Sequence, residues 1–573
     1  MDIGSINSLK KGSADRKVFE EGEIDSRIKR YLLPEKIVWK TASDAKSSID
    51  NEKALFERKS GQIGFNSENA TILKNTGGRA SIVLDFGIEL HGGIQLLTWS
   101  CGNSKTARIR VRFGESVMET MSEVGESGST NDHAIRDHYL EVSFLGMTEI
   151  GNTGFRFVRI DLLDEECYLE IKSVRAIFLY KDIEYKGSFI SNDPLLNKIW
   201  DTGAYTVHLN MQNYLWDGIK RDRLVWIGDM HPETSTIQAV FGYDDTVPRS
   251  LDFIRDETAL PGWMNGIPSY SMWWILIHYS WYMQNGDLEY LHQQKEYLLG
   301  LLHQLDSYVD SDGEENTPEV RFIDWPSAGD KHTVDAALHA LCTMAMEAGS
   351  EICKVLGEIQ ESERALETVK RLRKPSVSHN GSKQAAALIG LAGLQDFDLL
   401  NKDVLSVDGA KRLSTFMGYY ILKARGRAGD IDGCLDIIRS YWGGMLKLGA
   451  TTFWEDFNID WVKNAARIDE IPENEKVDVH GRYGDHCYKG YRHSLCHGWA
   501  SGPTAWLSEF VLGVKIIEPG CTVIRISPEL GDLQWVEGTY PTPKGIVHIK
   551  HERQQDGKIR STIHAPESIK VIK

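Results

Sequence analysis

The sequence lacks several features that define large protein classes. Its eight cysteines are scattered without the spacing of a disulfide framework, and it has no long apolar run. The most apolar stretch, residues 270–283, is interrupted by His278, Tyr279 and Ser280, so we expect a buried helix there rather than a membrane span. Residues 1–7 show no apolar signal-peptide core. We therefore expect a cytoplasmic protein with reduced cysteines and no membrane contact.

Signature loops of several enzyme classes are also absent. The chain has no G-x-S-x-G elbow, no Walker loop and no G-x-G-x-x-G motif, so serine-hydrolase, nucleotide-hydrolysing and dinucleotide-dependent functions lose support. Acidic side chains number 82 against 65 basic ones, which gives a formal charge of −17. A nucleic-acid partner would need a cationic surface, so we expect none. Nothing in the sequence calls for a cofactor.

Hydrophobic periodicity divides the 573 residues into three regions. Residues 1–185 alternate between apolar and polar side chains, as in ARIRVRF at 107–113 and FRFVRI at 155–160, which predicts an antiparallel β-sandwich domain. We expect turns at Gly92-Gly93, Gly102-Asn103 and Gly151-Asn152. Residues 514–573 alternate again, with strands expected at 522–526, 545–550 and 559–565, and form a small C-terminal β-domain.

The middle region, residues 186–513, has a helical period. Asn192-Asp193 is a good cap for a helix that starts at Pro194, and Gly, Asp or Asn punctuates the short linkers. No repeat of fixed period appears, so an (α/α) barrel is favoured over a regular solenoid. Thirteen of the 16 tryptophans fall here, which indicates a large core or an aromatic sugar-binding cleft. The helices are expected at 233–242, 270–284, 287–309, 333–356, 361–373, 382–395, 409–425, 430–447 and 502–512.

Residues 217–233 (DGIKRDRLVWIGDMHPE) form the densest group of charged side chains. The segment lies in a loop or irregular helix end that precedes a helix starting after Pro232. A solvated loop with local ion pairs would explain the composition. A carboxylate-lined pocket with an aromatic wall, as glycoside hydrolysis requires, would explain it equally well.

Two later segments carry further candidate chemistry. Glu455 follows Trp454 at the end of a helical run, as either a helix-terminal acid or a proton-transfer group. In the segment 493–503, a tight turn would point His497 into the cleft. A zinc site of His and Cys could include His486-Cys487, but the spacing matches no metal motif, and Cys–His nucleophilic chemistry has equally little support.

Three of these segments, in this order, resemble the glycoside hydrolase family 78 α-L-rhamnosidases, which are six-hairpin glycosidases. They are Asp217 with residues 220–229, then Ala450-Thr451-Thr452 with Trp454-Glu455, then residues 494–497; Asp324-Trp325 is a weaker fourth match. The resemblance implies an (α/α)₆ barrel flanked by β-sandwich domains, and inverting hydrolysis of a terminal α-L-rhamnose. It also makes a homodimer reasonable.

Carried over by position, the resemblance makes Glu455 the general base and Asp222 the general acid. The rhamnose subsite would contain the remaining matched residues, which are Asp217, Arg221, Trp226, Asp229, Trp325 and His497. We expect Trp226, Trp325 and Trp454 to form aromatic walls against the sugar's methyl group.

The acid motif departs from the family pattern. Many members carry Arg-Asp-Glu-Arg where this chain has the shorter Arg221-Asp222-Arg223, and the surrounding cations favour an ionised Asp222 although a general acid must be protonated. Asp229 or Glu233 could substitute for it. Gly218-Ile219 replaces a common Cys-Pro, and Cys496 a common asparagine.

Three functions stay open at this point. The leading hypothesis is an intracellular α-L-rhamnosidase for small rhamnosides. The second is a hydrolase or lyase for another L-sugar or a uronate-linked rhamnoside, in which Lys220 and Arg221 would serve an acidic neighbouring sugar. The third is a non-catalytic sugar-binding protein, suggested by the shortened acid motif.

Overall fold

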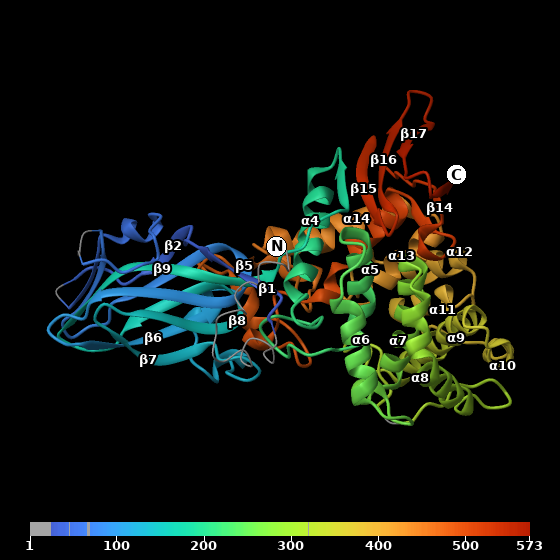
Figure 1. Ribbon diagram of the computed structural model, residues 1–573, viewed down its shortest axis with the longest axis horizontal. Helices are drawn as coiled ribbons and strands as arrows, with labels where there is room; N and C mark the ends of the chain where they lie inside the picture. Colours follow the sequence, from blue (N-terminus) through green and yellow to red (C-terminus); the bar gives the residue numbers. More distant parts are fainter. Residues whose placement is uncertain (1–23, 45, 66–68, 319) are drawn as a thin grey trace, which may run out of the picture.

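The computed structural model describes residues 24–44, 46–65, 69–318 and 320–573. Figure 1 shows an elongated molecule with a β-domain at one end, a helical domain at the other, and the last strands standing against the helices. Residues 1–7, where we expect no signal peptide, lie outside the described residues. No helix in the described ranges is long and apolar enough to cross a membrane.

The β-domain is built on antiparallel strands. Within the described residues, nine strands join in one sheet with the central order β3-β4-β9-β5-β8-β6-β7, while β1 pairs with β9 and β2 with β5. Apolar side chains between the folded layers form its core, as the alternating pattern predicts. The strands are β1 (Arg27–Leu32), β2 (Lys36–Lys40), β3 (Ser47–Asp50), β4 (Thr71–Asn75), β5 (Ser81–Ser100), β6 (Thr106–Gly114), β7 (Asp137–Ser143), β8 (Met147–Leu162) and β9 (Cys167–Lys181).

Two of the three glycine turns expected in this domain are wrong. Gly92-Gly93 lies inside β5 and Gly151 inside β8, and only Gly102-Asn103 is a turn. A Cβ on Gly92 would approach the carbonyl oxygen of Ile177 to 2.1 Å, so the glycine permits close strand pairing next to a bulge. The sequence pattern around these glycines does not distinguish a glycine inside a strand from one in a turn.

The middle of the chain is helical, as predicted. Asp193 caps the first long helix by accepting the N–H groups of Leu195 and Leu196, an interaction that contributes about 1 kcal/mol. The helices are α4 (Pro194–Asn210), α5 (Met230–Val240), α6 (Thr246–Glu257), α7 (Pro268–Asn285), α8 (Leu288–Ser307), α9 (Lys331–Val355), α10 (Ile359–Leu372), α11 (Lys383–Leu391), α12 (Phe397–Leu400), α13 (Gly418–Arg427), α14 (Ile431–Ile437), α15 (Gly443–Lys447), α16 (Val479–Arg482) and α17 (Gly502–Trp506).

Several helix boundaries differ from the prediction. The charged helix α6 was missed, and α13 starts only at Gly418 because Asp408, Gly409 and Arg412 have left-handed backbone angles that break a helix from 409. Helix α5 starts at Met230 and takes Pro232 into its first turn, where a missing N–H costs nothing. Helix α7 is almost entirely buried, as expected for the most apolar stretch.

The C-terminal strands form two small sheets. Strands β10 (Ser188–Ser191), β15 (Trp535–Thr542), β16 (Gly545–Arg553) and β17 (Ile559–His564) pair in that order, beside β13 (Val514–Ile516), β14 (Val523–Ile526) and β18 (Lys570–Ile572). A short pair, β11 (Ala465–Ala466) and β12 (Val477–Asp478), lies in the segment before α16. Strand β10 belongs to the C-terminal sheet, although its residues lie in the region predicted to be helical. The division at 185 and 513 stays a prediction.

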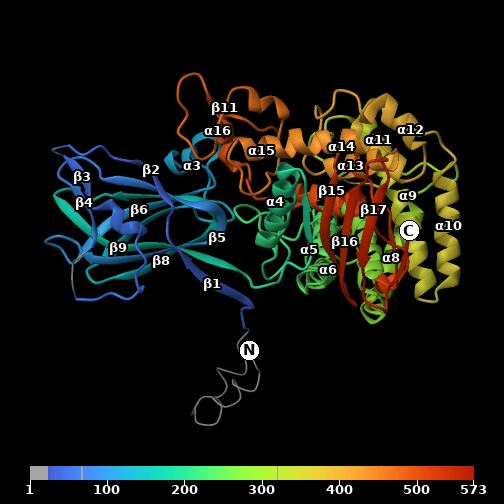
Figure 2. The same cartoon turned by 90° about the horizontal axis from the view of Figure 1, so that it is seen from above.

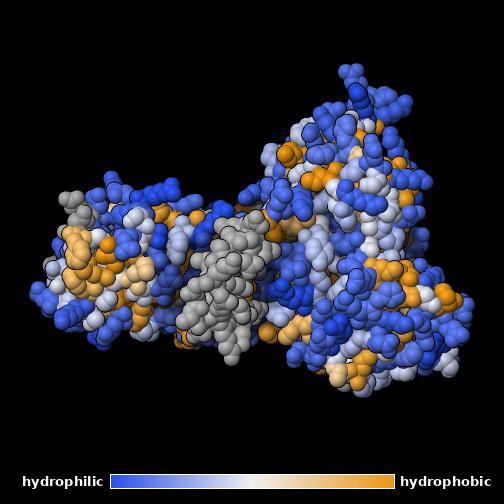
Figure 3. Space-filling model, in the orientation of Figure 1, coloured by the Kyte–Doolittle hydropathy of each residue, from blue (hydrophilic) through white to orange (hydrophobic). Residues whose placement is uncertain are grey.

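The β-domain and the helical domain meet through polar contacts. Figure 2 shows α3 (Val117–Met121) of the β-domain beside α16, and Ser116 Oγ lies 2.8 Å from His480 Nδ1 at this junction. Charged and polar side chains cover most of the face in Figure 3, with apolar residues in separate small patches. The junction brings residues of the β-domain close to the candidate site.

Candidate active site

One cavity of the helical domain collects the site residues predicted from the sequence. Its volume is about 230 Å³, small beside the about 300–1,000 Å³ of typical ligand sites, which suits a single sugar ring. All eight predicted residues line it, namely Asp217, Arg221, Asp222, Trp226, Asp229, Trp325, Glu455 and His497.

Residues 217–229, which we call the pocket loop, fold back on themselves. Asp217 Oδ1 accepts the N–H of Leu224 at 3.0 Å, and the Asp217 N–H donates to the Leu224 carbonyl at 3.2 Å. Asp222 and Arg223 at the tip have φ of 54° and 55°, in the left-handed region. Backbone strain of this kind concentrates at functional sites. The loop is therefore a fixed structure rather than a solvated linker.

Glu455 is held as a carboxylate by the pocket loop. Both of its oxygens accept from Arg221 Nη2, at 2.5 and 2.6 Å, and Oε2 also accepts the Ser494 N–H at 3.0 Å. Burial raises the pKa of Glu455, but Arg221, His497 and His493 outweigh burial and lower that pKa to about 2. Glu455 is thus ionised at neutral pH. It lies in a loop after α15, not at a helix end.

Asp222 shares the same guanidinium. Its Oδ1 accepts from Arg221 Nη1 at 3.0 Å, and its Oδ2 accepts the indole N–H of Trp226 at 3.2 Å. Its side chain is partly exposed, at 18%, whereas that of Glu455 is buried. One guanidinium therefore spans two carboxylates of different environment, and the more exposed one lies at the loop tip.

A third group of polar side chains surrounds His497. The ring Nε2 lies 3.2 Å from Asp229 Oδ2, and Tyr270 donates to Asp229 Oδ1 at 3.3 Å. Burial lowers the pKa of His497, but the attraction of Glu455, Asp229 and Asp217 outweighs it and raises that pKa. Burial raises the pKa values of Asp217 and Asp229. The floor of the pocket can therefore hold and donate protons.

Glu233, the other acid considered from the sequence, lies outside the cavity lining. Its side chain is fully buried, and neither carboxyl oxygen has a hydrogen-bond partner among the described residues. Burial, reinforced by Asp229 and Asp217, raises the pKa of Glu233 well above its usual range, which favours the neutral acid in the folded protein.

Aromatic side chains wall the cavity, as expected, but not all the predicted ones. Trp226 and Trp325 line it, whereas Trp454 is 1% exposed and packs in the core, so its assignment as a wall is wrong. Trp499 takes that place, with its ring 4.4 Å from the His497 ring and its N–H on the Glu455 carbonyl at 2.9 Å.

Further lining residues were not named from the sequence. Trp499 follows His497 by two positions and could have been included with that motif. Arg492, Phe322 and Tyr270 come from segments without a distinctive pattern, and only the fold brings them to the pocket. Cys487, named from the sequence only as a possible zinc ligand, also lines the cavity.

Among the described residues, the His and Cys side chains of residues 486–497 do not form a metal-binding group. In the part of the chain that the structure describes, the only group with metal-binding distances is Glu115, Glu119 and His480, at the domain junction. Lys220 Nζ lies 2.9 Å from Glu115, 3.4 Å from Glu119 and 3.5 Å from His480 Nε2, so an ammonium already supplies the positive charge there. Cys496 is buried and lies near the Thr206 carbonyl instead.

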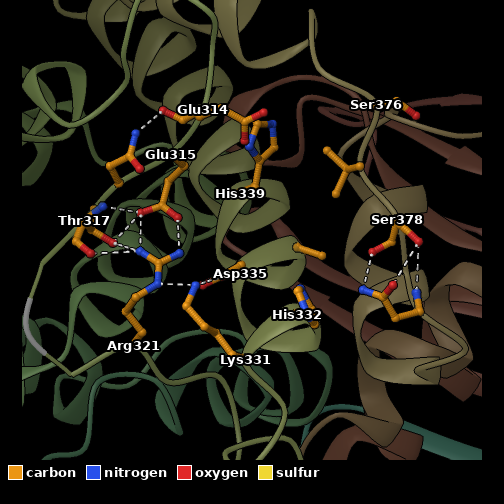
Figure 4. A pocket seen from close by; sticks show the side chains of 14 residues that line it. Glu314, Glu315, Thr317, Arg321, Lys331, His332, Asp335, His339, Ser376 and Ser378 are labelled. Atoms are coloured by element: carbon orange, nitrogen blue, oxygen red, sulfur yellow. Dashed lines mark hydrogen bonds and ion pairs between the residues drawn. The ribbon is translucent and has the colours of Figure 1, made fainter.

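A second, larger cavity of about 520 Å³ lies on the far part of the helical domain (Figure 4). Arg321 crosses it and pairs with Glu315 at 2.8 Å and with Asp335 at 2.8 Å. Arg321, Glu315, Asp335 and Lys331 are thus paired with one another, and no sequence motif maps to this cavity. The pocket loop cavity remains the candidate active site.

Comparisons with known proteins bear on the family of this chain. Residues 184–381 match the family described as the bacterial α-L-rhamnosidase six-hairpin glycosidase domain. An α-L-rhamnosidase of Alteromonas sp. (strain LOR) is 23% identical over 538 residues, 83% of this chain and 54% of that protein. The resemblance to family 78 drawn from three sequence segments is thereby confirmed.

Solved structures show the same fold. The family 78 rhamnosidase of Bacillus sp. GL1 aligns with a TM-score of 0.73 at 21% identity, over 91% of this chain and 55% of that one. A rhamnosidase of Klebsiella oxytoca with rhamnose bound aligns with a TM-score of 0.64 at 16% identity, over 88% of this chain and 97% of that one. The chain thus spans about half the length of the Alteromonas and Bacillus proteins.

Proposed function

We propose that this chain, whose residues 184–381 match the six-hairpin glycosidase domain of bacterial α-L-rhamnosidases, hydrolyses terminal α-L-rhamnose from small rhamnosides. The observation that carries the proposal is the Asp222–Arg221–Glu455 bridge in a ring-sized pocket. The surrounding helices would form an (α/α)₆ barrel with β-sandwich domains beside it. We keep the cytoplasm as the proposed location, because all eight cysteines are unpaired.

The proposed reaction inverts the configuration at the anomeric carbon. Glu455, ionised at neutral pH, would take a proton from water as it attacks, and Asp222 would protonate the departing oxygen. One guanidinium bridges the two carboxylates. The inverting mechanism requires a gap of about 6.5–9.5 Å between the two carboxyl groups, in which the water must fit.

The aromatic lining of the cavity favours a deoxysugar as substrate. Trp226, Trp325 and Trp499 would pack against the apolar face and methyl group, while Asp217, Asp229 and His497 would accept and donate hydrogen bonds to the ring hydroxyls.

A uronate-linked substrate has less support. Arg221 already pairs with Asp222 and Glu455, and Lys220 is buried against Glu115 and Glu119, so neither cation is free to bind a second carboxylate.

A panel of p-nitrophenyl glycosides tests the proposal. The wild-type chain should release nitrophenol from the α-L-rhamnoside and not from the glucuronide. Replacing Glu455 by glutamine should lower kcat at least about 100-fold, because the base is lost. Rhamnose binding in calorimetry without turnover of any rhamnoside would instead favour a non-catalytic sugar-binding protein.

A further inference from the structure

A loop of the β-domain reaches the tip of the pocket loop. It precedes β7, and Asn131 Oδ1 fixes it by accepting the N–H groups of Arg136 and Asp137 at 3.2 Å each. Arg136 is buried and donates to the carbonyls of Glu119 and Ser122 at 3.0 Å each. The loop is therefore anchored within its own domain before it meets the helices.

Two side chains of this loop face the site. His133 Nδ1 lies 3.5 Å from Asp222 Oδ1, and its Nε2 lies 3.6 Å from Asp132 Oδ2. Asp132 in turn pairs with Arg492, which lines the pocket. His133 has φ of 62°, a left-handed conformation that directs its ring between the two carboxylates. The imidazole thus stands between an acid of its own loop and the candidate general acid.

Contacts between the two domains fix this loop next to the pocket loop. Lys220, the residue before Arg221, is buried among Glu115 and Glu119 of the β-domain and donates to the His493 carbonyl at 2.7 Å. These buried ion pairs join the two domains directly beside the pocket loop. The distance between His133 and Asp222 is therefore set by the fold rather than by a free loop.

Asp222 needs a source for the proton that it donates. A general acid must deliver a proton, and both oxygens of Asp222 already accept hydrogen bonds, from Arg221 and from Trp226. His133 is a neighbour whose imidazole can both accept and return a proton. We propose that His133, oriented by Asp132, is the proton-holding partner of Asp222; the inference rests on the proposed function.

The proton balance is simple. As the bond between the anomeric carbon and the glycosidic oxygen breaks, that oxygen takes the proton of the Asp222 carboxyl group. Asp222 receives that proton from Nδ1 of the His133 imidazolium in the same step, so the pair starts with one proton, and solvent then reprotonates His133, whose side chain is 29% exposed. Water attacking the anomeric carbon loses its proton to Glu455. The 3.5 Å separation is longer than a hydrogen bond, and catalytic contacts often tighten when substrate binds.

The test compares two leaving groups. p-Nitrophenolate departs with little acid assistance, whereas a sugar hydroxyl needs it, so a partner of the acid affects only the second. His133→Asn keeps a residue that tolerates a positive φ but cannot hold a proton. Ile135→Ala, an exposed position of the same loop, is the matched control. Thermal unfolding and KM are measured for each variant.

His133→Asn should lower kcat about tenfold or more on a rhamnosyl disaccharide and change it less than about threefold on the p-nitrophenyl rhamnoside. KM should stay unchanged. The alkaline limb of the pH–rate profile should move to lower pH, because no other charged group near His133 can supply the proton in its place. Those groups are Asp132, Asp222, Arg221 and Arg492.

Asp132→Asn, which leaves the ring in place without its orienting carboxylate, should give a smaller loss of the same kind. Equal losses on both substrates, or none, would overturn the proposal, as would a pH profile like that of the control. If the wild-type chain hydrolyses no rhamnoside at all, the proposed function fails first, and this inference falls with it.

Discussion

Replacing Arg221 by methionine removes the cation that keeps Glu455 ionised. The pKa of Glu455 drops from 4.5 to about 2 in the folded protein, which corresponds to about 3 kcal/mol at about 1.4 kcal/mol per unit. This stabilisation is present above about pH 4.5 and is lost as the pH falls toward 2, because a depressed carboxyl pKa favours folding only while the group is ionised in the folded state. Without Arg221, burial dominates and Glu455 becomes protonated at higher pH.

The assay is the pH dependence of kcat/KM on p-nitrophenyl α-L-rhamnoside. The wild-type profile should show no acidic limb from Glu455 above about pH 3. Arg221→Met should show such a limb above pH 4.5, and its kcat/KM at pH 7 should fall about 100-fold or more. Arg223→Met is the matched control, because Arg223 donates to the Asn152 carbonyl and not to Glu455. An unchanged acidic limb in Arg221→Met would refute this account of Glu455.

Three further predictions concern buried or exposed acids and their partners. Asp222→Asn should lower kcat by about 10²–10⁴ on a rhamnosyl disaccharide and less on the p-nitrophenyl substrate; equal effects would remove Asp222 as the acid. Glu233→Gln should raise the unfolding temperature at pH 8 but not at pH 4, because the raised pKa of Glu233 makes the wild type less stable as pH rises; no pH-dependent difference would contradict a neutral Glu233. Lys220→Met should cost about 3–5 kcal/mol of unfolding free energy in denaturant titrations, since Glu115 and Glu119 lose their buried partner, and a loss below 1 kcal/mol would contradict that role.

The candidate site was predictable from the sequence because its chemistry is concentrated locally. Asp217, Arg221, Asp222, Trp226 and Asp229 fall within 13 residues, and the resemblance to family 78 picked this segment out. The structure shows that most of this loop is buried, which excludes a solvated surface loop. Matching of two more short segments then located Glu455 and His497.

The errors have physical causes in tertiary packing. A tryptophan next to a catalytic candidate can face either side of its chain, and Trp454 turns into the core while Trp499 faces the cavity. Gly92 and Gly151 lie inside long strands, where the Ile177 backbone approaches Gly92 and the Phe113 ring approaches Gly151, which no local pattern reveals. The sequence predicted the helices better than their ends.

The contribution of the β-domain lay beyond sequence reasoning. His133 and Asp132 are 89 residues or more from Asp222, in a loop of ordinary polar composition. Only the anchored loop and the Lys220 contacts bring them to the pocket loop. The junction between the domains therefore places residues of the β-domain beside the pocket loop.

The most direct test of the central claim is the anomer released first. Proton NMR should follow hydrolysis of p-nitrophenyl α-L-rhamnoside within the first minutes, before mutarotation mixes the products. Inversion by the Asp222 and Glu455 pair predicts β-L-rhamnose as the first product. First-formed α-L-rhamnose, or no rhamnose at all, would contradict the account.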